Sequence, residues 1–198
     1  MTGPAALPAD AAWVVIDTLF EATHLAEFCA DIERLYRINP YLEFRYWRAG
    51  DIGEHEVSFR NLSNQRDFVL TLAVEGTPGC EFRVRYDRGV KRGTHFRIAP
   101  HGSGSRLTIT DEYESTAGDD VDLGAVDKSL HAWGVALQEY LRRHARWGRY
   151  RWWRWYMRRV WVPMKPSGRR IVYILWVLTV FEIALIALGF AIYWIEYR

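Results

Sequence analysis

The sequence has few of the residues that would point to an extracellular or disulfide-stabilised protein. It contains two cysteines, Cys29 and Cys80, without CxxC spacing or a cysteine-rich context. This pattern is typical of a reducing compartment, so we predict two free thiols that are buried as small apolar side chains. The first residues, MTGPAALPADAAW, have no basic stretch followed by a long apolar run, and we therefore expect no secretory signal.

Motifs of common enzymes are also missing. No GxSxG, GxGxxG, Walker loop or HExxH occurs, and the six histidines show no metal-ligand spacing. We therefore predict no metal and no cofactor, and we place an enzyme behind a binding or structural protein among the possible functions.

Acidic residues are absent from one long segment. Residues 142–170 carry 11 Arg and Lys and no Asp or Glu, whereas residues 1–141 carry 14 basic and 22 acidic residues, a net charge of −8. An acidic body repels nucleic acid, so the basic character belongs to residues 142–170 alone.

The long apolar run lies at residues 171–195. About 20 apolar residues are enough to cross a hydrocarbon core of about 30 Å, so this run predicts a transmembrane helix. The basic residues precede the run, and only one Arg and one Glu follow it. This asymmetry predicts a single-pass protein of a bacterial-type inner membrane with its N-terminal domain in the cytoplasm.

These features divide the chain into four parts. We expect a flexible N-terminus at residues 1–11, a folded domain at 12–143, a basic aromatic juxtamembrane stalk at 144–170 and the transmembrane helix at 171–195. The folded domain is close to the modal domain size of about 100–150 residues and can enclose one hydrophobic core.

Apolar periodicity predicts the elements of the domain. Residues 12–20 are β-branched and apolar enough for a strand, and residues 21–40 repeat apolar side chains every three or four positions, as one kinked helix or two short ones do. Turn residues then separate six alternating segments at 41–48, 55–61, 67–75, 80–86, 94–99 and 105–114. Residues 125–143 predict a long amphipathic helix that covers the apolar face of this antiparallel meander.

This order of elements, with the stretch FEATHLAEFCADIERLYRINPYLEF in which a helix ends at Asn-Pro and opens the second strand, resembles the START-like superfamily. The superfamily is also called SRPBCC or helix-grip and includes polyketide cyclases and coenzyme Q-binding proteins. The resemblance implies an α+β fold in which an antiparallel seven-stranded curved sheet wraps around a long C-terminal helix. It also implies an apolar cavity between sheet and helix for a lipid, sterol, quinone or polyketide.

The apolar face of the meander supplies the candidate ligand-binding residues. One polar residue, Asp111, interrupts that face. A buried carboxylate is costly unless it is paired, so Asp111 is either a ligand anchor or weak catalytic candidate, or a residue that reaches water at the rim. The aromatic side chains either line a cavity or form ordinary core. The candidates are Phe44, Tyr46, Phe59, Leu70, Phe82, Val84, Tyr86, Phe96, Ile109, Asp111, Tyr113 and Trp133.

The stalk has three interpretations. A basic, aromatic-rich helix next to a membrane span fits the lipid headgroup region, and it also fits a partner membrane protein. Nucleic acid is the weakest interpretation because the span holds this segment against lipid. The predicted membrane-interface residues are Arg151, Trp153, Arg154, Arg158, Arg159 and Trp161.

Glu182 lies near the middle of the predicted span. An ionisable side chain at that depth normally faces protein or water, so Glu182 either contacts a partner helix or is protonated and faces lipid.

The sequence leads to three functional hypotheses. The first is a membrane-tethered domain that binds a hydrophobic ligand such as a lipid, quinone or isoprenoid, with membrane lipids as its other partner and no nucleic acid. The second is an accessory or assembly subunit of an integral membrane complex. The third is a cyclase or hydratase that uses Asp111.

Overall fold

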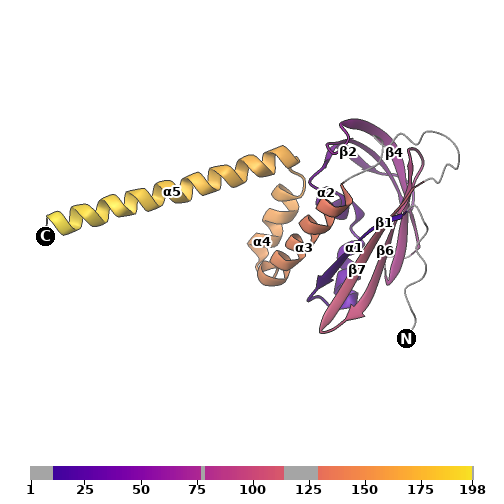
Figure 1. The fold of residues 1–198 in the computed structure, drawn as a ribbon, viewed down its shortest axis with the longest axis horizontal. Helices are drawn as coiled ribbons and strands as arrows, with labels where there is room; N and C mark the ends of the chain where they lie inside the picture. Colours follow the sequence, from indigo (N-terminus) through magenta and orange to yellow (C-terminus); the bar gives the residue numbers. More distant parts are fainter. Residues whose placement is uncertain (1–10, 77–78, 114–128, 198) are drawn as a thin grey trace. The chain divides into compact units, whose positions relative to one another are not determined.

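A computed structural model describes residues 11–76, 79–113 and 129–197, and it divides the chain into two compact units, Met1–Pro163 and Met164–Arg198 (Figure 1). The expected flexible N-terminus lies outside the described residues except for Ala11. The same is true of residues 125–128 of the predicted long helix.

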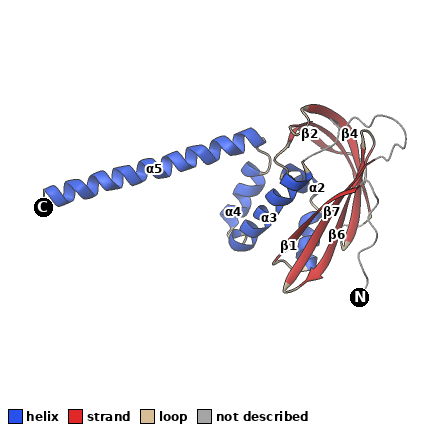
Figure 2. Ribbon diagram, in the orientation of Figure 1, coloured by secondary structure: helices blue, strands red, loops and turns tan. Residues whose placement is uncertain are grey.

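Seven antiparallel strands form one curved sheet in the first unit (Figure 2). The strand order is β1-β7-β6-β5-β4-β3-β2, so the meander runs through the sheet in sequence and β1 closes against β7. The sequence predicted all seven strands, although β6 extends beyond both ends of the predicted segment 94–99. The strands are β1 (Ala11–Thr18), β2 (Leu42–Ala49), β3 (Glu54–Asn61), β4 (Arg66–Glu75), β5 (Glu81–Tyr86), β6 (Lys91–His101) and β7 (Gly104–Tyr113).

Two short helices connect β1 to β2. The segment predicted as one kinked helix or two short ones contains α1 (Ala22–Cys29) and α2 (Ile32–Arg37). Asp31 separates them, because its side chain accepts a hydrogen bond from the backbone N–H of Arg34 and caps α2. Leu25, Cys29 and Leu35 point inward and have no exposed surface.

The long helix α3 (Leu130–Trp147) covers the concave side of the sheet. It buries Leu130, Trp133, Leu137, Tyr140 and Leu141, which recur at helical spacing as in the predicted amphipathic helix. The indole Nε1 of Trp133 donates a hydrogen bond of 3.0 Å to the carbonyl of Leu35, which ties α3 to α2. Gly134 permits a close approach to β1, because an added Cβ there would lie 2.4 Å from Val14.

A β-bulge in β2 changes which aromatic side chain faces inward. The pairing of β2 with β3 shifts between Phe44 and Tyr46. Strict alternation placed Tyr46 on the inner face, but after the bulge Trp47 packs against the core and Tyr46 bonds to Glu56 in an exposed position.

The segment predicted as a stalk is largely part of the first unit. The predicted boundary at residue 143 falls inside α3, and the chain then forms α4 (Arg151–Tyr156) and a π-helical turn, η1 (Met157–Trp161). Trp153 and Met157 are buried, and the Trp153 ring lies 5.3 Å from the ring of His144. These apolar side chains recur at helical spacing, so they pack on α3 in the same way as any amphipathic helix does.

The second unit contains one helix, α5 (Pro166–Glu196). It is long and apolar enough to cross a membrane, with a mean hydropathy of 2.5 and none of its most apolar window buried. Pro166 occupies the first turn, where its missing N–H costs nothing, so it starts this helix and does not interrupt one.

The two cysteines lie in the first unit, and both thiols are free. Cys29 is buried as predicted. The prediction of burial was wrong for Cys80, which is exposed in the connection just before β5.

Candidate ligand-binding site

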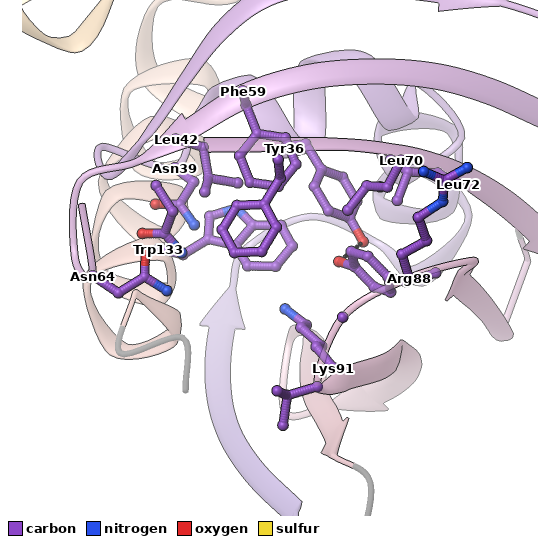
Figure 3. A pocket seen from close by; sticks show the side chains of 15 residues that line it. Tyr36, Asn39, Leu42, Phe59, Asn64, Leu70, Leu72, Arg88, Lys91 and Trp133 are labelled. Atoms are coloured by element: carbon purple, nitrogen blue, oxygen red, sulfur yellow. Dashed lines mark hydrogen bonds between the residues drawn. The ribbon is translucent and has the colours of Figure 1, made fainter. Parts of the chain in front are cut away.

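A small cavity of about 50 Å³ lies between the sheet, the end of α2 and the first turns of α3 (Figure 3). Trp133 and Asn39 border it on one side, and Leu70 and Leu72 border it on the other. Lys91 extends toward it from β6. The lining residues are Tyr36, Asn39, Leu42, Phe59, Asn61, Asn64, Phe68, Leu70, Leu72, Tyr86, Arg88, Gly89, Val90, Lys91 and Trp133.

The apolar part of the lining comes from β2, β3, β4 and α3. Phe59 and Phe68 stack with their ring centroids 5.4 Å apart, and Leu72 is 1% exposed. These residues face the cavity because period-two alternation points them to the concave side of the sheet. They offer an apolar environment to whatever enters.

The polar part is a continuous chain of hydrogen bonds that ends at the cavity. The Lys91 ammonium lies 2.7 Å from Oδ2 of Asp111, and the Thr94 hydroxyl donates to Oδ1 of Asp111 at 2.8 Å. The Tyr86 hydroxyl lies 3.1 Å from Oγ1 of Thr94 and 2.8 Å from the Tyr36 hydroxyl. Of these five side chains, Lys91, Tyr86 and Tyr36 line the cavity.

Burial determines the charge states of these hydrogen-bonded side chains. The side chain of Asp111 has no exposed surface and that of Lys91 is 14% exposed, so the two charges form a largely buried ion pair. Burial, and next the neighbouring Tyr86, raise the pKa of Tyr36 well above its ordinary value, and Lys91 opposes this only in part. Tyr36 therefore keeps its proton and offers a neutral hydroxyl.

Asp111 itself does not line the cavity. Its carboxylate lies behind Lys91 and Thr94, so the position on the apolar face is explained by pairing with Lys91 and not by exposure to water at the rim. A general acid or base must reach the atom it protonates or deprotonates, and Asp111 lacks that access in this structure. Because Thr94 donates to Asp111, Tyr86 donates to Thr94 and Tyr36 donates to Tyr86, so these two hydroxyls present only acceptor lone pairs to the cavity and the ammonium of Lys91 supplies N–H donors.

The structure divides the predicted ligand-binding residues into two sets. Phe59, Leu70, Tyr86 and Trp133 line the cavity. The others lie elsewhere: the Phe82 and Phe96 rings stack at 4.6 Å, Tyr46 is on the outer face, and Tyr113 is half-buried at the end of β7. Phe44, Val84 and Ile109 are buried in the core. Of the twelve candidates, four therefore line the cavity and five are ordinary core.

Eleven of the fifteen lining residues were not among the predicted candidates, and Tyr36, Lys91 and Asn39 show why. Tyr36 was placed on the apolar side of a helix, and its hydroxyl, which reaches Tyr86, has no sequence signal. Lys91 lies in DRGVKRG, which was assigned to a turn, whereas β6 begins at Lys91 and a bulge follows before Gly93. Asn39 was considered only as the residue at which a helix ends, and not as a residue of a binding site. One signal for Lys91 was available, because a carboxylate on an apolar face requires a nearby cation.

Metal chemistry has no candidate centre in residues 11–76, 79–113 and 129–197, where no group of three or more His, Cys, Asp or Glu side chains comes together.

The predicted membrane-interface residues are also divided. Arg151, Arg154, Arg158 and Arg159 are exposed. Trp153 is buried in the first unit, and the Trp161 ring lies 5.8 Å from Tyr140. The two tryptophans therefore hold the segment on α3, and of the six predicted residues only the four arginines are exposed. In the second unit, Glu182 lies on α5 and is exposed.

Comparison with solved structures identifies the fold. A START superfamily protein from Mycobacterium smegmatis superposes with a TM-score of 0.51 at 12% identity, covering 67% of this chain and 97% of that one. A protein of Deinococcus radiodurans superposes with a TM-score of 0.50 at 12% identity, covering 70% of this chain and 98% of that one. The sequence matches no family model and no curated protein. The first unit therefore has the START-like, helix-grip fold that the sequence predicted, and α5 is an addition to it.

Proposed function

We propose that the domain binds an apolar small molecule that carries a neutral oxygen, such as a quinone or an isoprenoid alcohol, in the cavity between the sheet and α3. The observation that supports this proposal is the buried chain of Lys91, Asp111, Thr94, Tyr86 and Tyr36, which brings polar groups to one side of an otherwise apolar cavity. Sites of this kind use apolar walls for affinity and a few polar groups for orientation.

The charges favour a neutral group over a carboxylate. Lys91 already faces the buried carboxylate of Asp111 at 2.7 Å, so the pair has no net charge to offer to an anion. The Lys91 ammonium has three N–H donors, whereas the Tyr36 and Tyr86 hydroxyls donate their protons to Tyr86 and Thr94 and can only accept from a ligand. A carbonyl or hydroxyl oxygen accepts from Lys91, and a ligand hydroxyl can also donate to Tyr36, without bringing a second negative charge into a buried place.

The size of the cavity adds a condition. Pockets for small molecules occupy about 300–1,000 Å³, whereas this cavity measures about 50 Å³. A ligand of quinone size therefore requires the walls to move. Arg88, Gly89 and Val90 line the cavity from the turn between β5 and β6, and they are the parts of the wall outside any helix or strand, together with Asn64 and Asn39. We expect this turn to be displaced on binding.

The test compares two neighbouring positions on β4 that face opposite sides of the sheet. Leu70 lines the cavity, and Val69 is 55% exposed on the outer face. The full-length protein and its Leu70→Phe and Val69→Phe variants are purified in detergent, extracted with organic solvent and examined by mass spectrometry. An oxygen-bearing apolar compound should accompany the wild type and Val69→Phe and be depleted in Leu70→Phe. Equal amounts in all three, or none in any, would contradict the proposal.

The proposal also includes attachment to the membrane by α5 with the domain in the cytoplasm. It rests on the 11 basic residues of 142–170 against the single Arg and Glu after the span. A reporter fused before Met1 should be active in the cytoplasm and one fused after Arg198 in the periplasm. The opposite result would reverse the orientation.

A second candidate function is an accessory subunit of a membrane complex. The filled core around Phe82, Val84 and Phe96 favours it, because a domain without a ligand needs no larger cavity. In this case Glu182 is the intramembrane contact to a partner. Glu182→Gln should then change the co-purifying membrane proteins, whereas Glu196→Gln, at the end of α5, should not. Identical profiles for both variants would count against this function.

A further inference from the structure

A second cleft, separate from the cavity described above, lies where α1, α2, α3 and η1 meet. It has a volume of about 320 Å³ and is lined by Phe20, His24, Glu27, Arg34, His144 and Arg158, together with Phe28. Arg158 comes from η1 of the segment that the sequence assigned to a stalk. The folding of that segment onto α3 therefore brings an arginine of the basic run beside a buried arginine of the START-like domain.

Arg34 is a fixed cation at the base of this cleft. Its side chain is 9% exposed, and its Nη2 donates a hydrogen bond of 2.8 Å to the carbonyl of Phe28. The guanidinium lies 4.2 Å over the Phe28 ring, and Nε lies 3.5 Å from the Asp31 carboxylate. Nε is buried and makes no hydrogen bond within the part of the chain that the structure describes. The group is thus held in place with donor capacity left over.

His144 and Arg158 form the other side. The His144 ring is held between aromatic neighbours, with Trp153 at 5.3 Å and Phe20 at 5.7 Å, and its buried Nδ1 has no hydrogen-bond partner among the described residues. Arg158 is exposed at the mouth. Burial first, and then Arg34, Arg154 and Arg158, lower the pKa of His144. The histidine therefore experiences a net positive environment.

The acidic groups nearby do not cancel this charge. Glu27 lines the cleft from α1 and is exposed, and Asp31 lies against Arg34. Two arginines, Arg34 and Arg158, line the cleft with His24 and His144, and a third, Arg154, acts on His144 from nearby. The three guanidinium groups outnumber the two carboxylates by one, and Nδ1 of His144 has no hydrogen-bond partner among the described residues. Such a cleft suits an anion with several oxygen atoms, because arginine binds these groups in a planar, forked geometry.

We propose that this cleft binds a phosphate-class anion, supplied either by free phosphate or by the headgroup of an anionic phospholipid. The lipid source has support in the chain itself, since Arg158 precedes the first residue of α5 by eight positions. The anion contacts Arg158 and His144 at the mouth and meets the field of Arg34 at the base. The site does not depend on the cavity near Lys91.

The test uses the full-length protein in micelles of an uncharged maltoside detergent, which brings no phosphate. The ring signal of His144, identified by its loss in His144→Gln, is followed by NMR against pH in three arms. These arms are sodium chloride, inorganic phosphate at the same ionic strength, and phosphatidylglycerol added to the micelles. A bound anion offsets the positive field, so it should raise the pKa of His144 in the phosphate or the phosphatidylglycerol arm.

Two adjacent arginines provide the matched comparison. Arg158 lines the cleft, whereas Arg159 is exposed and does not, and each change to Gln removes one charge. Arg158→Gln should raise the concentration of anion needed for half of the shift by about tenfold or more, and Arg159→Gln should change it by less than about twofold. Leu70→Phe should leave the shift unchanged, which separates this site from the proposed ligand cavity.

The arms identify the source of the anion. A shift with phosphatidylglycerol alone supports the site with a lipid headgroup as its ligand, and a shift with inorganic phosphate alone supports it with free phosphate. No shift in either arm, or equal weakening by Arg158→Gln and Arg159→Gln, would overturn the proposal.

Discussion

The two units of this chain are both rich in apolar residues, but they place them in opposite ways. In the first unit the apolar residues of β4 alternate, so that Leu70 and Leu72 are buried while Val69 is exposed. In α5 the apolar residues follow one another without a period, and none of its most apolar window is buried. Alternation lets β4 bury one face, whereas α5 is apolar all round and long enough to span a membrane as proposed, which would require an apolar environment.

The length of α5 fits that requirement. Its 31 residues extend about 46 Å at about 1.5 Å per residue, more than the roughly 30 Å of a hydrocarbon core. In a bilayer spanned as proposed, the excess would bring Tyr193 and Trp194 toward a headgroup region, where aromatic residues with a polar edge are favoured. We therefore expect water around the first unit and a bilayer around α5.

The largest effect is expected from charges placed on α5. Ile183→Arg together with Ile186→Arg should oppose insertion by roughly 5–7 kcal/mol, because each arginine at the centre of a span costs about 2.5–3.5 kcal/mol. Extraction of membranes at alkaline pH should release this variant. Val69→Arg with Val135→Arg is the control, since these two side chains of the first unit are each 55% exposed to water. Release of both variants, or of neither, would contradict the contrast between the units.

The next effect concerns the buried ion pair of the first unit. Lys91→Met should destabilise the domain by about 3–5 kcal/mol, because it removes the cation beside the buried Asp111. Adding Asp111→Asn to it should restore most of the loss, since both charges are then gone and an amide oxygen still accepts from Thr94. Urea unfolding followed by near-UV circular dichroism measures both. Additive losses would show that the two charges act independently.

Overpacking distinguishes filled core from cavity within the first unit. Val84 has no exposed surface and does not line the cavity, so Val84→Phe should cost about 1–3 kcal/mol. Leu70→Phe adds bulk beside open space and should cost less. Thermal unfolding of the full-length variants compares them. A larger loss for Leu70→Phe would indicate that the cavity has no spare volume.

The smallest effect is a dependence of stability on pH. Burial lowers the pKa of His55 from its ordinary value of 6.5, and its Nδ1 accepts a hydrogen bond of 3.3 Å from the Trp47 indole. The unfolded chain therefore binds this proton at a higher pH than the folded one does. Stability should be complete above about pH 6.5 and decrease as the pH falls below it.

Two substitutions check this sign. His55→Gln should flatten the pH dependence, whereas His131→Gln, at an exposed position of α3, should leave it unchanged. The second unit has no histidine, so attachment to the membrane should not vary over the same range. A stability that rises as the pH falls from 7 to 6 would contradict the account.

The fold was predictable because it depends on features that are local in the sequence. Alternation fixed which side of β4, β5 and β7 faces inward, and turn residues fixed where the strands end. The exceptions have one physical cause. A β-bulge inserts a residue without a composition signal, and bulges exchanged Tyr46 for Trp47 in β2 and moved the start of β6 to Lys91.

The candidate site was less predictable because it depends on contacts between distant residues. Tyr36 and Tyr86 are 50 positions apart, and Lys91 and Asp111 pair across two neighbouring strands. The sequence marked Asp111 as unusual but did not identify its partner. The packing of residues 151–161 on α3 could not be predicted from the sequence either, because the same spacing of tryptophans suits a membrane surface and a protein surface.

The most direct test of the central claim is an experimental structure of the full-length protein with the compound extracted from it. The account predicts that an oxygen of this compound lies about 2.7–3.2 Å from Nζ of Lys91 or from a hydroxyl of Tyr36 or Tyr86. It also predicts that the turn at Arg88, Gly89 and Val90 is displaced from its position here. A cavity that contains only water, or a compound bound away from these groups, would contradict it.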